Sequence, residues 1–424
     1  MTKASALYDL LTDHLGFALP VGLRFWDGST AGPDDGPVVV VRHRRAVRHL
    51  VRQPGELGAA RAYVAGDLDV EGDVAEALRR TWAAWHAAGA PRPKLRARTV
   101  ARGGALAVRL GAIGRRPAPP AAEARLSGEL HSRERDRAAI AHHYDLSNDF
   151  YALILDPTMA YSCGFHTDPD ETLQHAQEAK LDLVCRKLDL QPGMRMVDIG
   201  CGWGSLTLHA AEHYGVHVTG VTLSSEQRDF VLARAAERGL ADRVDVSLRH
   251  YRDLDVPVGA VDAIASIEMG EHVGDAEYVD FTGAIARYLR PGGRVLIQQM
   301  SRHGAKPGGG PFIETYIAPD MHMKPLSRTI ELITGAGLEI GDVQAMREHY
   351  PRTVAAWSEQ LESRWDEAVK LVGEQVARVW RLYLAGGSLA FEQNRMGVDQ
   401  ILAVKTHPDG RSGLPASPTA WLGA

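Results

Sequence analysis

The sequence predicts an α/β fold, with a parallel, doubly wound sheet in the C-terminal two-thirds of the chain. Short apolar segments alternate with amphipathic helical segments from about residue 126 onward, as they do in βαβ units. A run with glycine at every second position, Asp198-Ile199-Gly200-Cys201-Gly202-Trp203-Gly204, stands where the first of these strands would turn into a helix. Glycines at such a turn let the backbone pass close to a ligand.

Five strands and the helices between them are expected in this region. The strands are Arg195–Ile199, His217–Val221, Val244–Leu248, Val261–Ser266 and Arg294–Gln299. The helices include Gly204–Tyr214, Gln227–Arg238 and Ala276–Leu289. Farther on, apolar residues between Trp357 and Tyr383 recur at helical spacing. We expect this stripe to pack in the core or between the subunits of a homodimer; the alternative is that it lines an acyl tunnel.

The length of 424 residues favours two domains over one. Residues 1–86 mix strand and helix signals and predict a smaller α+β domain, and residues 126–424 form the larger domain. Residues 87–125 join them and are strongly basic, with no acid between Ala87 and Ala122. This segment is expected to be a solvated linker, and the alternative is a surface that rests on anionic lipid head groups.

Composition excludes several classes of protein. Apolar residues make up 45% of the chain and charged residues 24%, as in ordinary globular proteins. The net charge of −5 argues against a nucleic-acid partner, and no apolar run is long enough to span a bilayer. We therefore expect a cytoplasmic protein with reduced cysteines. No spacing of histidine, cysteine and acidic residues suggests a metal site.

The glycine-rich run decides between two nucleotide ligands. A dinucleotide site would need G-x-G-x-x-G and an acid about 20 residues later, but Ser205 takes the sixth position and the second strand ends in Thr222-Leu223-Ser224. A site for S-adenosylmethionine (SAM) needs an acid on the first strand followed by G-x-G-x-G, which this run provides. Leu289-Arg290-Pro291-Gly292-Gly293, before the fifth strand, supports SAM as well.

Several further motifs surround this run in a fixed order. AIAHHYDLSNDFYALILDPTMAYSCGFH precedes it, and VTGVTLSSEQ, HYRDL, SIEMGEHVG, FIETYIAPDMHMKPLS and EHYPRTVAAW follow it. In this order the chain resembles the cyclopropane-fatty-acyl-phospholipid synthase family of SAM-dependent methyltransferases, which includes the mycolic-acid cyclopropane synthases. The resemblance extends over nearly the whole chain, because ARAYVAGDLDVEGDV is similar to the N-terminal lipid-binding domain of the longer members.

The resemblance implies two sets of site residues. SAM would be held by Tyr161, Ser162, Asp198, Gly200, Cys201, Gly202, Gly204, Thr222, Leu223, Gln227, Tyr251 and Arg252. Cys163, Glu271 and Tyr350 would match three members of a bicarbonate site, and Gln298 stands at the position of a fourth. Each of the first three also has a purely structural explanation. Cys163 could be a small buried residue, Glu271 an acid at a helix start, and Tyr350 a half-buried ring of the core.

The family's chemistry explains these residue types. A cis alkene in an acyl chain attacks the electrophilic methyl of SAM, and the resulting carbocation must be kept from water. A base then removes one proton, and bicarbonate is the family's acceptor. Rings such as Tyr144, Phe312, Tyr316 and Tyr350 are candidates for stabilising the cation through their faces.

Three positions depart from the family pattern. Gln298 replaces a histidine and so cannot carry a positive charge, and Gly270 and Ala318 replace phenylalanines. This combination resembles the actinobacterial branch that makes tuberculostearic-acid precursors. It predicts a peripheral membrane enzyme that converts the oleoyl chain of a phospholipid into a 10-methylene chain, which a separate reductase would saturate.

Three alternatives remain open at this point. A cyclopropane product shares every step up to the cation. A catalytically inactive module that binds lipid or SAM belongs to another class, and the intact glycine run counts against it. A small-molecule methyltransferase would not need the N-terminal domain.

Overall fold

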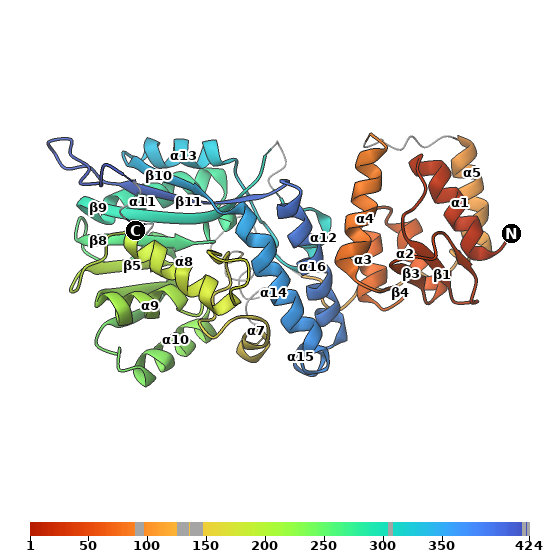
Figure 1. Ribbon diagram of the computed structural model, residues 1–424, viewed down its shortest axis with the longest axis horizontal. Helices are drawn as coiled ribbons and strands as arrows, with labels where there is room; N and C mark the ends of the chain where they lie inside the picture. Colours follow the sequence, from red (N-terminus) through yellow and green to blue (C-terminus); the bar gives the residue numbers. More distant parts are fainter. Residues whose placement is uncertain (90–96, 125–134, 136–146, 304–307, 418–420, 422–424) are drawn as a thin grey trace. The chain divides into compact units, whose positions relative to one another are not determined.

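The computed structural model describes residues 1–89, 97–124, 135, 147–303, 308–417 and 421 (Figure 1). They form two compact units. The N-terminal unit contains Met1–Ala124, Gly310–Tyr316 and Trp365–Leu389, and the main unit contains Arg125–Gly309, Ile317–Arg364 and Ala390–Ala424. No helix in the described part of the chain combines the length and apolar character needed to cross a bilayer.

The main unit is built on a sheet of seven described strands in the order β10-β11-β9-β8-β5-β6-β7. The strands are β5 (Arg195–Ile199), β6 (His217–Thr222), β7 (Val244–Leu248), β8 (Val261–Ile267), β9 (Leu289–Ser301), β10 (Glu339–Ala345) and β11 (Gly397–Val404). Strands β5 to β9 are parallel and confirm the five expected segments. Strands β10 and β11 are antiparallel additions at one edge, which the sequence did not predict.

Helices cover both faces of this sheet, as the parallel arrangement requires. One face carries α8 (Leu173–Lys187), α9 (Ser205–Tyr214) and α10 (Ser225–Glu237), and the other carries α11 (Asp275–Tyr288) and α13 (Leu326–Gly335). Successive strand residues point to opposite faces, so Met196 packs in the first cluster and Val197 in the second. The remaining elements are the helices α7 (Asn148–Ile154) and α14 (Tyr350–Ser363) and the 3₁₀ turns η1 (Tyr251–Asp253), η2 (Gly270–His272) and η3 (Arg347–His349).

The strand order places a ligand crevice next to β5. The strands β6 and β8 pair with opposite edges of β5. The strands β6 and β7 therefore extend the sheet on one side of β5, and β8 and β9 extend it on the other. In open α/β sheets, ligands bind at the carboxyl ends of the strands at such a switch point. The glycine-rich loop occupies this place.

The N-terminal unit contains a four-stranded sheet in the order β2-β1-β3-β4. Its strands are β1 (Gly22–Phe25), β2 (Thr30–Ala31), β3 (Val38–Val41) and β4 (Leu68–Glu71), and its helices α1 (Lys3–Leu15), α2 (Arg44–Arg52), α3 (Glu56–Val64), α4 (Val74–Ala87) and α5 (Ala97–Arg109). It also includes α12 (Pro311–Tyr316), α15 (Trp365–Val372) and most of α16 (Glu374–Glu392). Arg378 of α16 fixes this association, because its guanidinium donates to the carbonyl of Tyr63 at 2.7 Å and to Asp69 at 3.1 Å.

The segment expected as a basic linker is structured over much of its described length. Residues 97–109 form α5, which packs against α1. Arg102 is ion-paired with Asp13 at 2.6 Å, and Arg109 donates to the carbonyl of Met1 at 2.9 Å. Two of the basic side chains are therefore held within the N-terminal unit.

The apolar stripe near the C-terminus is divided among α14, α15 and α16. The breaks fall at Arg364 and at Gly373, which has a φ of 80°. Trp357, Leu361 and Trp380 are buried, as the core interpretation predicted. The homodimer stays a prediction.

Candidate active site

The glycine-rich loop connects β5 to α9. Gly200, Gly202 and Gly204 all have positive φ, at 82°, 53° and 78°, a region that L side chains rarely adopt. A Cβ at Gly202 would face open space, so the backbone is accessible to a ligand there. A Cβ at Gly204 would lie 2.8 Å from the Val231 side chain, so this glycine instead lets the loop pack against α10.

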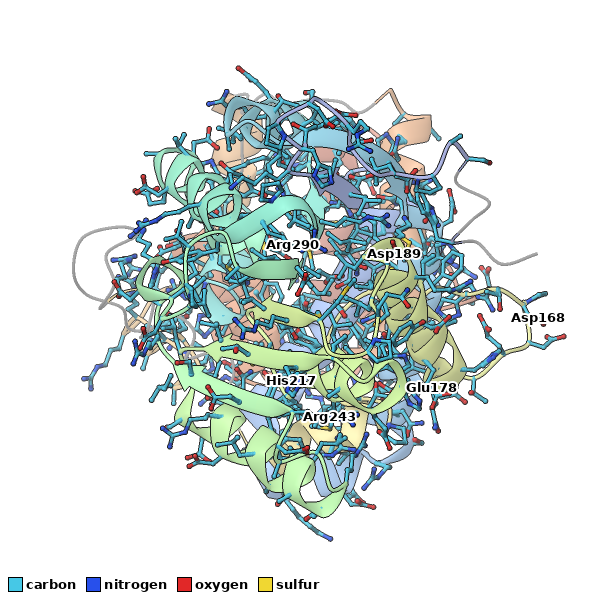
Figure 2. All side chains as sticks on the ribbon, turned by 90° about the vertical axis from the view of Figure 1, so that its left-hand side faces the viewer. Asp168, Glu178, Asp189, His217, Arg243 and Arg290 are labelled. Carbon is cyan, nitrogen blue, oxygen red and sulfur yellow. The ribbon has the colours of Figure 1, made fainter. Side chains whose placement is uncertain are left out.

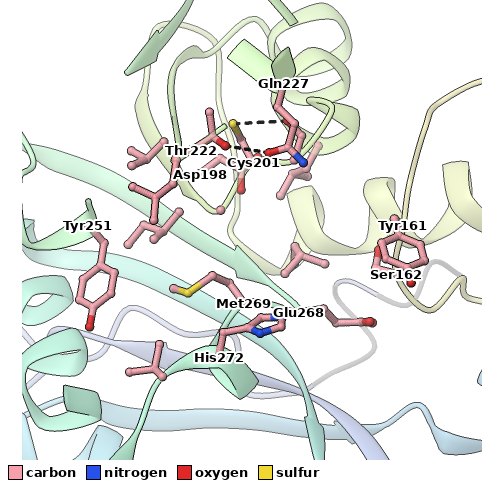
Figure 3. A pocket seen from close by; sticks show the side chains of 18 of the residues that line it. Tyr161, Ser162, Asp198, Cys201, Thr222, Gln227, Tyr251, Glu268, Met269 and His272 are labelled. Carbon is pink, nitrogen blue, oxygen red and sulfur yellow. Dashed lines mark hydrogen bonds between the residues drawn. The ribbon is translucent and has the colours of Figure 1, made fainter. Parts of the chain in front are cut away.

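A pocket lies at the carboxyl ends of β5, β6 and β8 (Figure 3). Every expected SAM-binding residue except Gly204 lines it. These residues are Tyr161, Ser162, Asp198, Gly200, Cys201, Gly202, Thr222, Leu223, Gln227, Tyr251 and Arg252. Segments far apart in the sequence thus meet around one pocket lined by both apolar and polar side chains, as ligand sites are.

Polar contacts hold the pocket walls in place. Thr222 donates to Gln227 at 2.7 Å, joining the end of β6 to α10 (Figure 3). Asp198 accepts from Thr207 at 2.8 Å, and burial raises the pKa of Asp198 to about 6 although that hydrogen bond acts to lower it. Ser162 accepts from the buried Lys180 ammonium at 2.9 Å. This lysine was not predicted from the sequence.

A second constellation is centred on Glu268, which follows β8 and lines the same pocket. Its carboxylate accepts three hydrogen bonds: from the backbone N–H of Cys163 at 2.8 Å, from the Gln298 amide at 2.9 Å and from the Tyr350 hydroxyl at 2.5 Å. The Gln298 amide is oriented in turn by Gln400, which donates to its oxygen at 3.0 Å. The structure therefore joins Cys163, Gln298 and Tyr350 as expected, but around Glu268.

Glu271 does not take the place that the resemblance implied. It lies in η2, three residues after Glu268, and its carboxyl is buried with one oxygen lacking a hydrogen-bond partner among the described residues. Burial and then the charge of Glu268 raise the pKa of Glu271 well above its usual range. Two neighbouring buried carboxyls do not both ionise readily. Of the two, Glu268 has the hydrogen-bond donors that favour a carboxylate, and Glu271 has the more strongly raised pKa.

Cys163 contributes its backbone and not its thiol. The sulfur lies 3.4 Å from the carbonyl of Gly164 and 3.7 Å from that of Met346, and burial raises the pKa of the thiol well above its usual range. A neutral buried thiol is not a nucleophile. The small side chain is consistent with the structural alternative, while the N–H binds the carboxylate.

The two departures at phenylalanine positions have different consequences. A Cβ at Gly270 would overlap the side-chain amide of Gln299, so that amide fills the space of the missing ring. Gln299 is fixed there by Tyr278 at 2.5 Å and Thr329 at 3.0 Å. Only Ala318 lines the pocket and leaves a ring volume open to it. Of the two replaced phenylalanines, only the one at Ala318 therefore enlarges the pocket.

The rings expected to stabilise a cation do not all lie in the same unit. Phe312 and Tyr316 pack within the N-terminal unit, where the Tyr316 hydroxyl donates to Glu123 at 2.9 Å. Tyr144 lies outside the described residues. Tyr350 belongs to the main unit, where its ring packs against Trp357 and Phe391.

The sequence contains one signal for Glu268. It is a polar residue directly after a buried parallel strand, where functional side chains gather. Its φ of 51° is strained for a residue with a side chain, and two other strained residues, Met159 and Asp320, line the same pocket. Backbone strain of this kind clusters at functional sites.

The loop geometry predicts that Gly202→Val abolishes SAM binding. The branched side chain would project into the open pocket. Gly239→Val is the matched control, because Gly239 has a φ of 70°, also faces open space and is exposed. Titration calorimetry should show loss of SAM binding in the first variant and ordinary affinity in the second, with similar losses of thermal stability. SAM binding by Gly202→Val at the wild-type affinity would contradict the assignment of the loop.

Comparisons with known proteins agree with this geometry. The family model described as mycolic acid cyclopropane synthetase matches residues 131–401. A probable fatty acid methyltransferase of Mycobacterium tuberculosis is 38% identical over 416 residues, covering 94% of this chain and 94% of that protein. Tuberculostearic acid methyltransferase UfaA1 of the same organism is 38% identical over 292 residues, covering 66% of this chain and 67% of that protein.

A solved structure extends the comparison to the fold. The crystal structure of mycolic acid cyclopropane synthase CmaA1 complexed with SAH and CTAB has a TM-score of 0.59 and 35% identity, covering 63% of this chain and 97% of that one. These matches confirm the resemblance and the α/β methyltransferase fold expected from the sequence. The chain belongs to the mycolic acid cyclopropane synthetase family of SAM-dependent methyltransferases.

Proposed function

We propose that the chain methylates the cis double bond of an oleoyl phospholipid and that the main product is a 10-methylene acyl chain. The observation that carries this proposal is the Glu268 carboxylate, which lines the SAM pocket and accepts three hydrogen bonds. A buried base beside the cofactor suits a reaction that ends with proton loss from a carbocation. A separate reductase would saturate the product.

Bicarbonate does not fit the place that the resemblance gave it. The Cys163 N–H, the Gln298 amide and the Tyr350 hydroxyl already donate to Glu268. A glutamate carboxylate offers the same planar pair of acceptor oxygens as bicarbonate. In this proposal Glu268 is the proton acceptor, and no step involves bicarbonate.

The chain's own residues then account for the course of the reaction. SAM, when bound, supplies an electrophilic methyl, and the alkene electrons form the new C–C bond as the C–S bond breaks. The negative charge of Glu268, at the wall of the pocket, stabilises the acyl cation. A hydride moves from the methyl-bearing carbon to its cationic neighbour. Glu268 takes a proton from the new methyl, and the electrons of that C–H bond form the methylene double bond.

Two observations favour the methylene product over the cyclopropane. The three hydrogen bonds hold Glu268 in one position. An acceptor that cannot move toward the new methyl gives the cation more time for the hydride shift. The similarity to tuberculostearic acid methyltransferase UfaA1 supports the same product. Cyclopropane formation is the second candidate, because it shares every step up to the cation.

The free-energy cost of burying the Glu268 carboxylate argues against a catalytically inactive module that binds lipid or SAM. Burying a carboxylate requires compensating donors, and three segments supply them at the pocket wall. A module that only binds would not need a base there. Conversion of SAM to S-adenosylhomocysteine with oleoyl phospholipid distinguishes the two classes.

Substitution of Glu268 tests its role as the base. Glu268→Gln preserves the shape of the side chain but removes the acceptor, so turnover should fall by about 100-fold or more while SAM affinity is unchanged. Glu271→Gln is the matched control: the amide resembles the neutral carboxyl, so most activity should remain. Steady-state kinetics and calorimetry measure both quantities.

The pH profile gives a second readout of the same assignment. Burial raises the pKa of Glu268, and the acceptor must be ionised to act. Wild-type activity should therefore fall as the pH drops through a value above the ordinary glutamate range. An active Glu268→Gln variant together with an inactive Glu271→Gln variant would transfer the role of base to Glu271.

The fatty-acid profile of cells tests the identity of the product. Cells that express the chain and contain oleoyl phospholipid should accumulate mainly the 10-methylene chain, and Gln298→His should raise the cyclopropane fraction because a charged ring would alter the position and basicity of Glu268. Gln299→His is the control, since Gln299 lies on the opposite face of β9. Gas chromatography with mass spectrometry measures both fractions. A profile from the unmutated chain that contained only cyclopropane would overturn the methylene assignment.

A further inference from the structure

A buried ammonium group lies at the wall of the SAM pocket without an ion-pair partner. Lys180 of α8 lines the pocket and is 1% exposed. Its Nζ donates one hydrogen bond, to the hydroxyl oxygen of Ser162 at 2.9 Å, and it forms no ion pair with the acids that the structure describes. Burial lowers the pKa of Lys180, although the charges of Glu268 and Asp156 act to raise it. A buried charge without a paired partner is costly, so this one calls for an explanation.

Helix α8 holds Ser162 in place with two of its side chains. Gln177, one turn before Lys180 on the same side of the helix, donates to the carbonyl of Ser162 at 2.8 Å. Residues two positions apart on a helix lie on nearly opposite sides, and Glu178 lies at the outer surface of the main unit (Figure 2). Lys180 therefore points inward, and Ser162 is fixed through both its backbone and its side chain.

The hydroxyl of Ser162 connects this ammonium to the pocket. Ser162 lines the pocket, and its hydroxyl oxygen accepts from Lys180. Among the described residues the hydroxyl donates to no acceptor, so its one hydrogen can be given to a ligand. A positive charge behind the hydroxyl strengthens such a bond when the ligand is an anion. Lys180 and Ser162 together thus suit an anionic group.

SAM carries one anionic group, the carboxylate of its amino-acid part. Two arginines, Arg249 and Arg252, also line the pocket, but each is ion-paired with an aspartate, at 3.3 Å and 3.9 Å respectively. Tyr251, between them in the sequence, lies across the pocket from Ser162 (Figure 3). The positive charge that is buried and not ion-paired therefore belongs to the Ser162 side of the pocket.

We propose that Ser162 binds the carboxylate of SAM and that Lys180 is a positioning residue, which orients the Ser162 hydroxyl and supplies the counter-charge behind it. Ser162 directly precedes Cys163, whose N–H binds Glu268. The sulfur of SAM, a short alkyl chain away from the carboxylate, would then be held on the Glu268 side of the pocket. The inference concerns binding of the cofactor and depends on neither the product nor the base of the proposed function.

The test compares two nucleosides that differ only in the carboxylate, S-adenosylhomocysteine and decarboxylated S-adenosylhomocysteine. Calorimetry measures the affinity of the full chain for each. Lys180→Met should weaken the binding of S-adenosylhomocysteine by about 10- to 100-fold, as expected for the loss of a charge-assisted hydrogen bond. The affinity for the decarboxylated nucleoside should not fall, because it has no carboxylate to lose.

Lys187→Met is the matched control. Lys187 lies on the same helix and is also fully buried, but it is ion-paired with Asp342 at 2.8 Å and does not line the pocket. This variant should lose thermal stability and keep its affinity for both nucleosides. Ser162→Ala should discriminate between the nucleosides as Lys180→Met does. The double variant should lose little more affinity than either single variant, because the two residues act as a unit.

Equal losses for the two nucleosides in Lys180→Met would show a merely structural role for the lysine and would overturn the proposal. An unchanged affinity for S-adenosylhomocysteine would overturn it as well. If Lys180→Met does not fold, Ser162→Ala decides the question. Loss of affinity for S-adenosylhomocysteine alone supports the carboxylate site, and equal losses for both nucleosides contradict it.

Discussion

The carboxylate of Glu268 is the group on which the arrangement of the active site depends. It binds the N–H of Cys163 from the loop before α8, the Gln298 amide from β9 and the Tyr350 hydroxyl from the start of α14. A buried carboxylate without such donors would cost several kcal/mol. The three donors make its burial possible, and the carboxylate in turn holds three distant segments around one wall of the SAM pocket.

This arrangement also sets the charge available to the reaction. Two neighbouring buried carboxyls resist carrying two charges, and the donors around Glu268 favour a single negative charge there. The buried Lys180 ammonium acts to lower the pKa of both Glu268 and Asp198, against the effect of burial. In the proposed mechanism the base belongs to the chain and is always present, whereas a bound anion must first be captured. The proposal thus has one acceptor position and a product that forms after the charge has moved.

Local patterns predicted much of the fold, and contacts between distant residues account for what was missed. The parallel strands and the loop at Gly200–Gly204 follow from nearby residues and were predicted. Strands β10 and β11 were not predicted. For β10 the reason is its alternation between half-buried and exposed positions at the sheet edge. The motif indicates Glu271 and not Glu268, because it fixes spacing but not the direction of side chains after a strained strand end. The loss of a ring at Gly270 is compensated by Gln299 on another strand, which no single motif reveals.

The bicarbonate dependence of the unmutated enzyme tests the central claim most directly. Turnover of SAM with oleoyl phospholipid is measured in buffer freed of carbon dioxide and again after bicarbonate is added back. If Glu268 is the acceptor, the rate is the same in both conditions, because its donors are already occupied. A rate that collapsed on depletion and returned with bicarbonate would show that an external anion takes the proton, and would contradict this account.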